Sequence, residues 1–245
     1  MAFLDGPAPY AFAHRGFAPG GDENSLAAFQ RAVDLGYTYL ETDVRVTADG
    51  VALAFHDATL DRLTQLRGRI EELPWATVRT ARVAGREPIP LLADVLTAWP
   101  HTRINLDVKS ERSVAAVVDV LRRTRSADRV CIVAFATRRI SAVRRALGEG
   151  LCTAFGPGAI ASLRLYGRAR HRGAGCIQAP VRIGGRRIVD SRFVRAAHGL
   201  GLPVIAYTVD DPAEMRALLD LGVDGLMTDR ADVLRDVLHE RGQWP

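Results

Sequence analysis

The sequence predicts a (β/α)8 barrel, an α/β fold in which eight parallel strands alternate with helices around a closed sheet. Eight short apolar runs with strand character alternate with amphipathic helical patterns along the 245 residues, and no long linker separates them. The rival is a doubly wound open sheet, which usually has fewer repeats and a glycine-rich phosphate loop after its first strand. The sequence contains no G-x-G-x-x-G or Walker motif, so we expect the barrel.

The expected strands are rich in β-branched and aromatic residues, which favour an extended backbone. In order, they cover residues 10–13, 39–46, 103–108, 130–135, 151–155, 176–179, 203–209 and 225–228. The expected helices cover residues 25–35, 90–99, 113–125, 137–147, 190–198, 212–221 and 231–240, with a further helix starting near 157. Asn24 or Ser25 should cap the first helix, and Gly36 should end it.

We expect a single domain that spans residues 1–245. Residues 57–90 lack clean periodicity, and irregular segments of that length inside a compact domain are commonly functional. This segment is therefore expected to be a small insertion that lies as a lid over the C-terminal face of the barrel.

The composition is ordinary for a globular protein, with 48% hydrophobic and 25% charged residues. The formal charge of +5 comes from arginine, because Lys109 is the only lysine. No aromatic residues are interleaved with the arginine pairs, so we expect no nucleic-acid binding. No apolar run approaches the roughly 20 residues of a membrane helix, and the N-terminus lacks a signal-peptide pattern. We expect a cytoplasmic protein without stable membrane insertion, and the oligomeric state stays open.

The three cysteines each lie in an apolar, strand-like run, at positions 131, 152 and 176. Disulfides are rare in cytoplasmic proteins. We interpret the cysteines as small buried hydrophobic residues, not as a disulfide set or a zinc site, whose ligands would be clustered.

Two acids two residues apart distinguish the second strand. Glu41 and Asp43 point to the same face because side chains alternate along a strand. Asp49-Gly50 is then a strong two-residue turn signal, and the return run leads to His56. If Asp49 and Gly50 are the two turn residues, His56 lies opposite Asp43. If the turn is longer by one residue on each side, His56 lies opposite Glu41 instead. The alternative is a pair of solvated charges on an edge strand.

Barrel enzymes carry their chemistry where the strands end, on the C-terminal face. Polar residues are concentrated at these ends. His14 and Arg15 follow the first strand, Asp107 and Lys109 lie two apart on the third, and Tyr207 lies on the seventh. Together with the second strand and its ribbon, these side chains are expected to converge on one mouth.

Three carboxylates gathered in a partly dry site need a cation to offset their charge. Glu41, Asp43 and Asp107 offer oxygen ligands only. Such ligands suit a hard divalent ion, so we expect Mg²⁺ or Ca²⁺ with water in the remaining positions.

The other polar residues of this set suit work on a phosphate. His14 and His56 are best used as general acid and base, because imidazole titrates near neutral pH. Arg15 and Lys109 add the positive charge that an anionic substrate requires, and phosphate is the obvious candidate. A metal, two proton carriers and two cations around a phosphate describe a phosphodiesterase.

Two functions from other classes remain open. Lys109 at a barrel strand end suits the amine of a Schiff-base aldolase, although this leaves the acids and histidines without a role. A non-catalytic phosphate or head-group binding module on the same barrel would bind ligand and release no alcohol. Glu23, just before the first helix, either orients a ligand or only favours the helix dipole.

Several segments together resemble the signature of the glycerophosphodiester phosphodiesterases. They are His14-Arg15-Gly16, Glu23-Asn24-Ser25, Glu41-Thr42-Asp43-Val44, Asp49-Gly50, His56-Asp57, Leu60-x-Arg62-x-Thr64, Ile89-Pro90-Leu91, Gly222-Val223-Asp224-Gly225 and Thr228-Asp229. The resemblance spans nearly the whole chain, and the ordered combination is far more specific than any one segment.

The resemblance implies a barrel enzyme that uses a divalent ion to hydrolyse small-molecule glycerophosphodiesters to glycerol 3-phosphate and an alcohol. Lysophospholipase D-type activity on the same site is the alternative. The roles implied by motif position are an acid–base pair, His14 and His56, two metal ligands, Glu41 and Asp43, and a phosphate contact, Arg15.

Three positions depart from the family pattern. In Leu106-Asp107-Val108-Lys109, Asp107 stands where the third metal ligand is frequently Glu. Ala134 stands where Ser is usual, and Tyr207 where Trp is usual. The last two departures bear on how the leaving alcohol is held, so Tyr207 is included as a possible substrate-pocket residue. Glu23 is included as another because it lies just before the first helix, near the barrel mouth.

Overall fold

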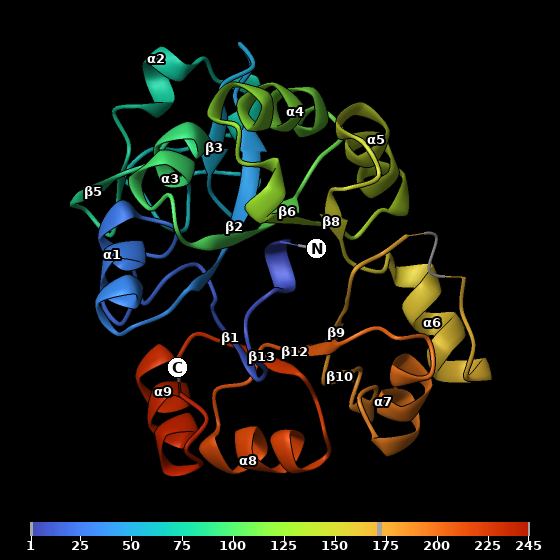
Figure 1. Cartoon of the computed structure of the whole chain (residues 1–245). Coiled ribbons are helices and arrows are strands. Elements are labelled where there is room, and N and C mark those ends of the chain that lie inside the picture. The colour runs from blue at the N-terminus through green and yellow to red at the C-terminus, as the bar shows by residue number, and fades with distance from the viewer. Residues whose placement is uncertain (1, 171–172, 245) are drawn as a thin grey trace.

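A computed structural model describes residues 2–170 and 173–244. In this part of the chain, eight parallel strands lie side by side in the order β8, β7, β6, β2, β1, β13, β12 and β9 (Figure 1). Their bounds are Tyr10–Ala13 for β1, Tyr39–Val46 for β2, Arg103–Val108 for β6, Val130–Val133 for β7, Cys152–Thr153 for β8, Ile177–Pro180 for β9, Val204–Tyr207 for β12 and Gly225–Thr228 for β13. The predicted α/β fold with eight parallel strands is confirmed.

The sheet is curled, and its two outermost strands approach each other. A parallel bridge joins Ala154, just after β8, to Cys176, just before β9. The Phe155 N–H also donates to the Cys176 carbonyl at 3.1 Å. Because β8 and β9 are the two ends of the strand order, these bonds bring the ends of the curled sheet together.

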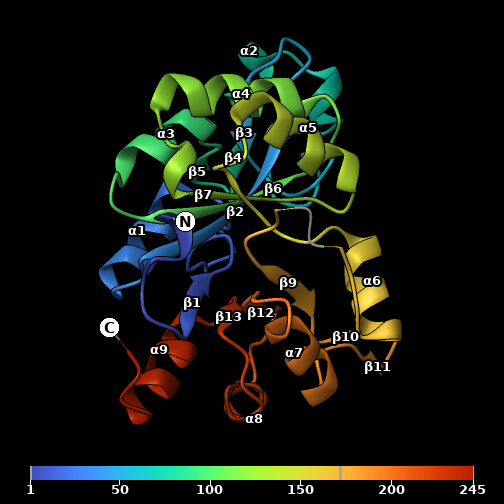
Figure 2. The ribbon, with the colours of Figure 1, turned by 45° about the vertical axis from the view of Figure 1, so that its right-hand side comes forward.

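Helices cover the outside of the curled sheet (Figures 1 and 2). Their bounds are Leu26–Asp34 for α1, Leu92–Ala98 for α3, Ser113–Thr124 for α4, Thr137–Leu147 for α5, Pro157–Tyr166 for α6, Ser191–His198 for α7, Pro212–Asp220 for α8 and Ala231–Glu240 for α9. Ser25 caps α1, its hydroxyl accepting from the Ala28 N–H at 3.0 Å, which confirms one of the two predicted caps. α3 starts at Leu92, later than predicted, because Leu91 before it is extended.

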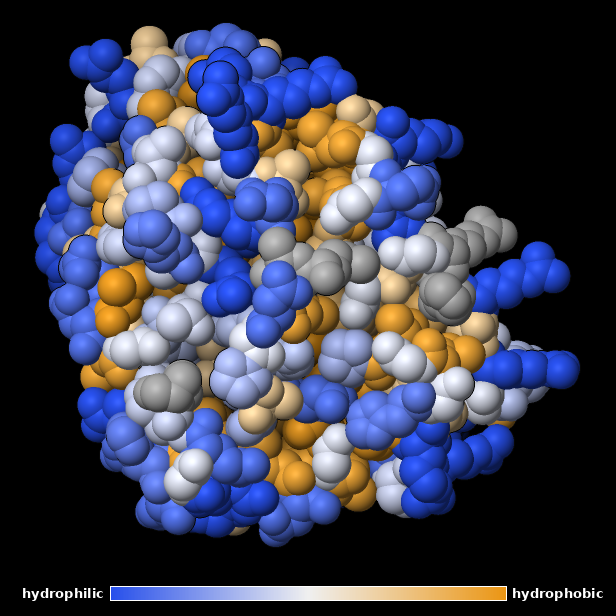
Figure 3. All heavy atoms as spheres, viewed as in Figure 1, coloured by the Kyte–Doolittle hydropathy of each residue, from blue (hydrophilic) through white to orange (hydrophobic). Residues whose placement is uncertain are grey.

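The main apolar core lies between the sheet and the helices, and a second cluster fills the barrel interior. Phe3 belongs to the second cluster and comes from a short 3-10 helix, η1 (Ala2–Leu4), near the centre of Figure 1. Its ring packs edge-on against Tyr39, with 5.6 Å between centroids. On the face that carries η1, hydrophilic side chains surround smaller hydrophobic areas (Figure 3). Among the described residues, no helix is both long and apolar enough to cross a bilayer.

The ribbon after β2 forms, but its register differs from both predicted registers. β3 (Ala52–Ala54) pairs antiparallel with β2, and Val44 faces Ala54. The Phe55 N–H donates to the Asp43 carbonyl at 2.9 Å, so Phe55, not His56, lies opposite Asp43. The prediction was wrong because the connection has three residues, 48–50: the Thr47 N–H donates to the Val51 carbonyl at 3.0 Å across it.

Residues 57–90 form an irregular layer with a small apolar cluster of its own. Its elements are the 3-10 helix η2 (Ile70–Glu72), the short helix α2 (Trp75–Val78) and the antiparallel pair β4 (Arg82–Val83) and β5 (Glu87–Pro88). Leu60 and Ile70 are fully buried in this cluster together with Phe55. The cluster ties the segment to the strand that delivers His56.

Candidate active site

The three predicted acids lie on two neighbouring strands. Glu41 and Asp43 occupy alternate positions of β2, so their side chains share one face. Asp43 pairs in register with Asp107 of β6, which places these two residues side by side. Glu41, Asp43 and Asp107 are only 3%, 1% and 6% exposed. Three buried carboxylates destabilise the fold unless cations or hydrogen bonds compensate them.

Lys109 and Arg15 supply part of that compensation. The Lys109 Nζ lies 2.7 Å from Asp43 Oδ1 and donates to Asp107 Oδ2 at 2.6 Å. The Arg15 Nε lies 3.0 Å from Asp43 Oδ2, and the Arg15 backbone N–H donates to Glu41 Oε2 at 3.2 Å. The sequence predicted both cations as contacts for a substrate phosphate, and here they pair with the protein's own carboxylates.

The compensation is uneven across the three acids. Burial, together with the neighbouring charge of Asp43, raises the pKa of Glu41 from 4.5 to about 7. Burial also raises the pKa of Asp107, in spite of Lys109. For Asp43 burial acts in the same direction, but Lys109 and Arg15 outweigh it and the pKa is lowered. Glu41 and Asp107 are therefore the acids at which burial outweighs the neighbouring cations.

A hard divalent ion would relieve this imbalance. The Asp107 Oδ1 is buried and has no hydrogen-bond partner, and a buried acceptor without a partner is unfavourable. A cation beside Glu41 and Asp107 would favour the charged form of both. Carboxylate oxygens are the ligands that Mg²⁺ and Ca²⁺ prefer. Lys109 lies between Asp43 and Asp107, so binding by all three acids requires side chains to turn.

Both predicted histidines are held by a carboxylate. His14 follows β1, and its Nδ1 lies 2.7 Å from Asp229 Oδ1. His56 Nδ1 lies 2.6 Å from Asp57 Oδ1. Because a carboxylate only accepts hydrogen bonds, Nδ1 carries the proton in each ring and Nε2 is left for proton transfer. The His14 Nε2 lies 3.7 Å from Glu41 Oε2.

The surroundings of His14 favour its charged form. Burial acts to lower the pKa of this imidazole, but the charge of Glu41 and the hydrogen bond with Asp229 outweigh burial. The net result is a raised pKa. Asp229 follows β13 directly, and sequence reasoning gave it no role. Its place at a strand end, in Thr228-Asp229, was the signal that could have assigned it.

Two further residues that sequence reasoning missed connect His56 to Arg15. Asp57, beside His56 in the chain, accepts from Arg62 Nε at 2.6 Å. Arg62 Nη2 also donates to Glu23 Oε1 at 2.8 Å, and Arg15 Nη1 donates to the same oxygen at 2.8 Å. The hydrogen bond from Arg62 is the main cause of a lowered pKa at Asp57. Glu23 thus joins two arginines.

Asn24 was predicted only as a helix cap, and the structure gives it a place beside the acids. Its Nδ2 donates to Asp43 Oδ2 at 3.0 Å, and Thr42 Oγ1 donates to its Oδ1 at 2.7 Å. Asn24 has φ +59, in the left-handed region that Asn tolerates better than most residues. This backbone turn brings an amide against a buried carboxylate.

A cavity of about 690 Å³ lies at the C-terminal ends of the strands. Eight of the nine predicted site residues line it: His14, Arg15, Glu41, Asp43, His56, Asp107, Lys109 and Tyr207. Glu23 does not line it, and neither does any residue of 57–90, all of which are described. The segment predicted as a lid therefore contributes no wall to the cavity, and it reaches the site through Asp57 and Arg62. Burial raises the pKa of Tyr207 to about 12.

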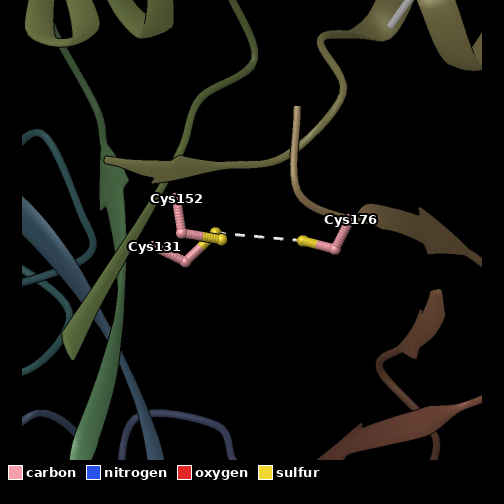
Figure 4. A group of neighbouring side chains, drawn as sticks. All are labelled: Cys131, Cys152 and Cys176. Atoms are coloured by element: carbon pink, nitrogen blue, oxygen red, sulfur yellow. Dashed lines mark hydrogen bonds between the residues drawn. The ribbon is translucent and has the colours of Figure 1, made fainter. Parts of the chain in front are cut away.

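The barrel interior below the cavity holds the three cysteines. Cys131, Cys152 and Cys176 are all buried, as predicted. Their side chains point toward one another in Figure 4, with 3.9 Å between the sulfur atoms of Cys131 and Cys176. The expectation that they would not cluster is wrong, because β8 and β9 meet where the curled sheet closes. Gln178 and Asn105 exchange amide hydrogen bonds of 2.7 and 3.1 Å and line the cavity above this cluster.

Known proteins resemble this chain along its length. The model of the Glycerophosphoryl diester phosphodiesterase family matches residues 14–233. A Probable glycerophosphodiester phosphodiesterase 2 of Mycobacterium tuberculosis is 41% identical over 100% of this chain and 96% of its own.

Solved structures share the fold. A putative glycerophosphoryl diester phosphodiesterase from Silicibacter pomeroyi superposes with a TM-score of 0.85 at 24% identity, over 100% of both chains. An Oleispira antarctica phosphodiesterase in complex with the product sn-glycerol-3-phosphate gives 0.82 at 22% identity, over 95% of this chain and 97% of its own.

Proposed function

The chain belongs to the glycerophosphoryl diester phosphodiesterase family, and on this premise we propose that it hydrolyses glycerophosphodiesters to glycerol 3-phosphate and an alcohol. The observation that carries the proposal is the pair of carboxylate-held imidazoles. His14 and His56 line the same cavity as three buried acids, and each ring keeps its Nε2 for proton transfer. Two proton carriers beside a cluster that calls for a cation match the needs of phosphodiester cleavage.

In this proposal Glu41, Asp43 and Asp107 hold a divalent ion, Mg²⁺ or Ca²⁺. Bound there, the ion supplies Lewis-acid stabilisation of the charge that grows on the phosphate oxygens. Lys109 and Arg15 have a double task. They hold the acids in place, as the ion pairs with Asp43 support, and they present positive charge to the phosphate at the cavity wall.

The two imidazoles divide the proton transfers. One Nε2 takes the proton of the nucleophile, which is water or the neighbouring glycerol hydroxyl, and the other gives a proton to the leaving alkoxide. Asp229 and Asp57 keep His14 and His56 in the tautomer that this requires, by accepting from Nδ1 at 2.7 and 2.6 Å. In this arrangement either ring can act as the base while the other acts as the acid.

The aldolase alternative finds little support in the site. A Schiff-base lysine must lose its proton to attack a carbonyl. Lys109 is instead held between Asp43 and Asp107. Burial acts to lower the pKa of this ammonium, but the two carboxylates outweigh it and raise the pKa.

Single-domain organisation and a cytoplasmic location stay predictions from the sequence.

The proposal is tested with a coupled glycerol 3-phosphate assay over several glycerophosphodiesters. We expect His14→Ala and His56→Ala each to lower kcat by about 100-fold or more. His101→Ala serves as the matched control, because His101 lies in an exposed turn outside the cavity. Activity in His56→Ala close to that of the control would refute the acid–base role. Binding of diesters without release of alcohol would instead support the head-group binding module.

A further inference from the structure

A group of three thiols in the barrel interior has no part in the proposed hydrolysis. Cys131 of β7 and Cys152 of β8 are paired in register on neighbouring strands, and Cys176 stands just before β9. Their sulfur atoms all lie within 4.8 Å of one another, and Figure 4 shows the side chains pointing toward one another. All three cysteines are free, and none is more than 1% exposed. Three neighbouring strands thus bring three thiols to the place where the curled sheet closes.

The spacing of the sulfur atoms fits a single metal ion. A thiolate sulfur lies about 2.3 Å from a bound ion such as Zn²⁺, so three sulfurs in a plane around one ion stand about 4 Å apart. The Cys131 and Cys176 sulfur atoms are 3.9 Å apart, and the Cys152 sulfur lies within 4.8 Å of both. Small turns of the side chains would bring all three sulfurs to bonding distance from one ion. A disulfide would need about 2 Å between two sulfurs and would leave the third without a partner.

The surroundings of the group favour negatively charged sulfur. Gln178 Nε2 donates to Cys131 Sγ at 3.9 Å and to Cys176 Sγ at 3.8 Å. The hydrogen bonds from Cys131 and Cys176 lower the pKa of the Cys152 thiol, and they outweigh burial. The positive charge of Arg144 acts in the same direction. Because only a thiolate is a good metal ligand, these contacts prepare the group for a cation.

We propose that Cys131, Cys152 and Cys176 bind one Cu(I) ion as three thiolate ligands. Among the described residues no histidine, aspartate or glutamate joins this group, whereas a structural zinc site almost always has four ligands. Thiolates select soft ions, Cu(I) among them, and the acids of the cavity suit a hard ion instead. On binding, the thiols lose their protons to solvent and the copper keeps its oxidation state. The proposal does not rest on the hydrolysis.

The bound ion would link three strands where the sheet closes. β8 has only two residues, and an isolated bridge from Ala154 to Cys176 joins this part of the chain to the residues before β9. Three metal–sulfur bonds across this closure should raise the free energy of unfolding, because the unfolded chain does not hold the three sulfurs together. Gln178 contacts two of the sulfurs and also lines the cavity, so the cavity is the entry route for the ion.

An anaerobic titration of the reduced, EDTA-treated protein with Cu(I) tests the proposal, with a chromophoric Cu(I) chelator as competitor. We expect one Cu(I) per chain that the chelator does not remove, and an X-ray absorption spectrum with three sulfur neighbours. The copper-loaded protein should also need more urea to unfold. No retained copper, or nitrogen and oxygen neighbours in place of sulfur, would overturn the proposal. These measurements use the wild-type chain, so they do not depend on the folding of a variant.

Variants then assign the ligands. Cys131→Ala, Cys152→Ala and Cys176→Ala should each weaken Cu(I) binding by about 100-fold or more, because loss of a ligand costs more than loss of a residue that only orients one. Far-UV circular dichroism without copper checks that each variant is folded. Met215→Leu is the matched control, because Met215 is a buried sulfur residue outside the cysteine group, and its affinity should stay within twofold of wild type. Equal affinities in the control and the cysteine variants would refute the assignment.

Three further outcomes would overturn the site. Loss of two thiols with no bound copper would show a disulfide in its place. Retention of Zn²⁺ but not of Cu(I) in the same competition would contradict the choice of ion. Glu41→Gln should bind Cu(I) as the wild type does, so loss of copper from this variant would place the ion at the acids of the cavity instead.

Discussion

Replacing Glu41 by Gln should stabilise the metal-free protein while it abolishes activity. Glu41 is 3% exposed, and burial with the nearby Asp43 raises its pKa from 4.5 to about 7. A carboxyl whose pKa is higher in the folded state binds its proton more tightly there than in the unfolded chain. Ionising it therefore lowers the free energy of unfolding as the pH rises from about 4.5 to about 7. Gln keeps the acceptor for the Arg15 N–H and removes the charge.

The size of the effect follows from the two pKa values. A pKa that rises from 4.5 in the unfolded chain to about 7 in the folded protein lowers the free energy of unfolding by about 3 kcal/mol. This full loss is reached at a pH where Glu41 is ionised in both the folded and the unfolded state. The stabilisation of Glu41→Gln over wild type should thus be small near pH 4.5 and reach about 3 kcal/mol at pH 8. Added Mg²⁺ or Ca²⁺ should reverse the order, because the proposed ion binds the folded wild type and stabilises it.

Urea unfolding in EDTA at pH 4.5, 6 and 8 measures this difference, and a second series contains Mg²⁺ or Ca²⁺. Glu111→Gln is the matched control, because Glu111 is an exposed acid paired with Arg138, and its effect should stay within about 0.5 kcal/mol at every pH. The reasoning fails if Glu41→Gln in EDTA is no more stable than wild type at pH 8, or if its gain does not grow with pH.

Three further changes probe the carboxylate that holds His14, the cation between two of the acids, and the cap of α1. Asp229→Asn should lower kcat by about 100-fold or more. The Asp229 carboxylate, 2.7 Å from His14 Nδ1, selects the tautomer with the proton on Nδ1, whereas an amide can also donate to this nitrogen. An unchanged kcat would contradict this. Lys109→Met should lower the free energy of unfolding in EDTA by about 3 kcal/mol or more, because the buried carboxylates of Asp43 and Asp107 lose their cation. An unchanged free energy of unfolding in urea would contradict this. Ser25→Ala should cost about 1 kcal/mol, because the Ala28 N–H loses its 3.0 Å acceptor, and urea unfolding with no change would refute the cap.

The strand and helix order could be predicted because each element carries a local signal. β13 and α5 have the predicted bounds, and Ser25 caps α1. The site followed from the same order, since parallel strands end on one face and most polar residues at those ends line one cavity. Local patterns and one rule of topology were sufficient for this part.

The register of the ribbon could not be predicted from Asp49-Gly50 alone. A two-residue turn fits that pair, but Asp49 Oδ1 accepts from Thr47 Oγ1 at 2.5 Å and from the Trp75 N–H at 2.9 Å. The second bond reaches across from the segment after His56, so the turn is shaped by a tertiary contact. Gly50, with φ +86, completes the three-residue connection.

Side-chain contacts between strands that are distant in the sequence could also not be predicted from local sequence patterns. The sequence suggested that Lys109 contacts phosphate, but the register of β2 with β6 brings Asp43 and Asp107 to either side of its ammonium. The cysteines cluster for a similar reason, because Cys176 joins the other two only when β9 meets β8.

The most direct test of the central claim is the rate of glycerol 3-phosphate release from glycerophosphoglycerol by the wild-type protein, before EDTA treatment, after it, and after addition of Mg²⁺ or Ca²⁺. We predict activity that EDTA abolishes and that one of the two ions restores, with no recovery in Glu41→Gln. Undiminished activity in EDTA, or full recovery in Glu41→Gln, would contradict the account of a divalent ion held by carboxylates in the cavity that His14 and His56 line.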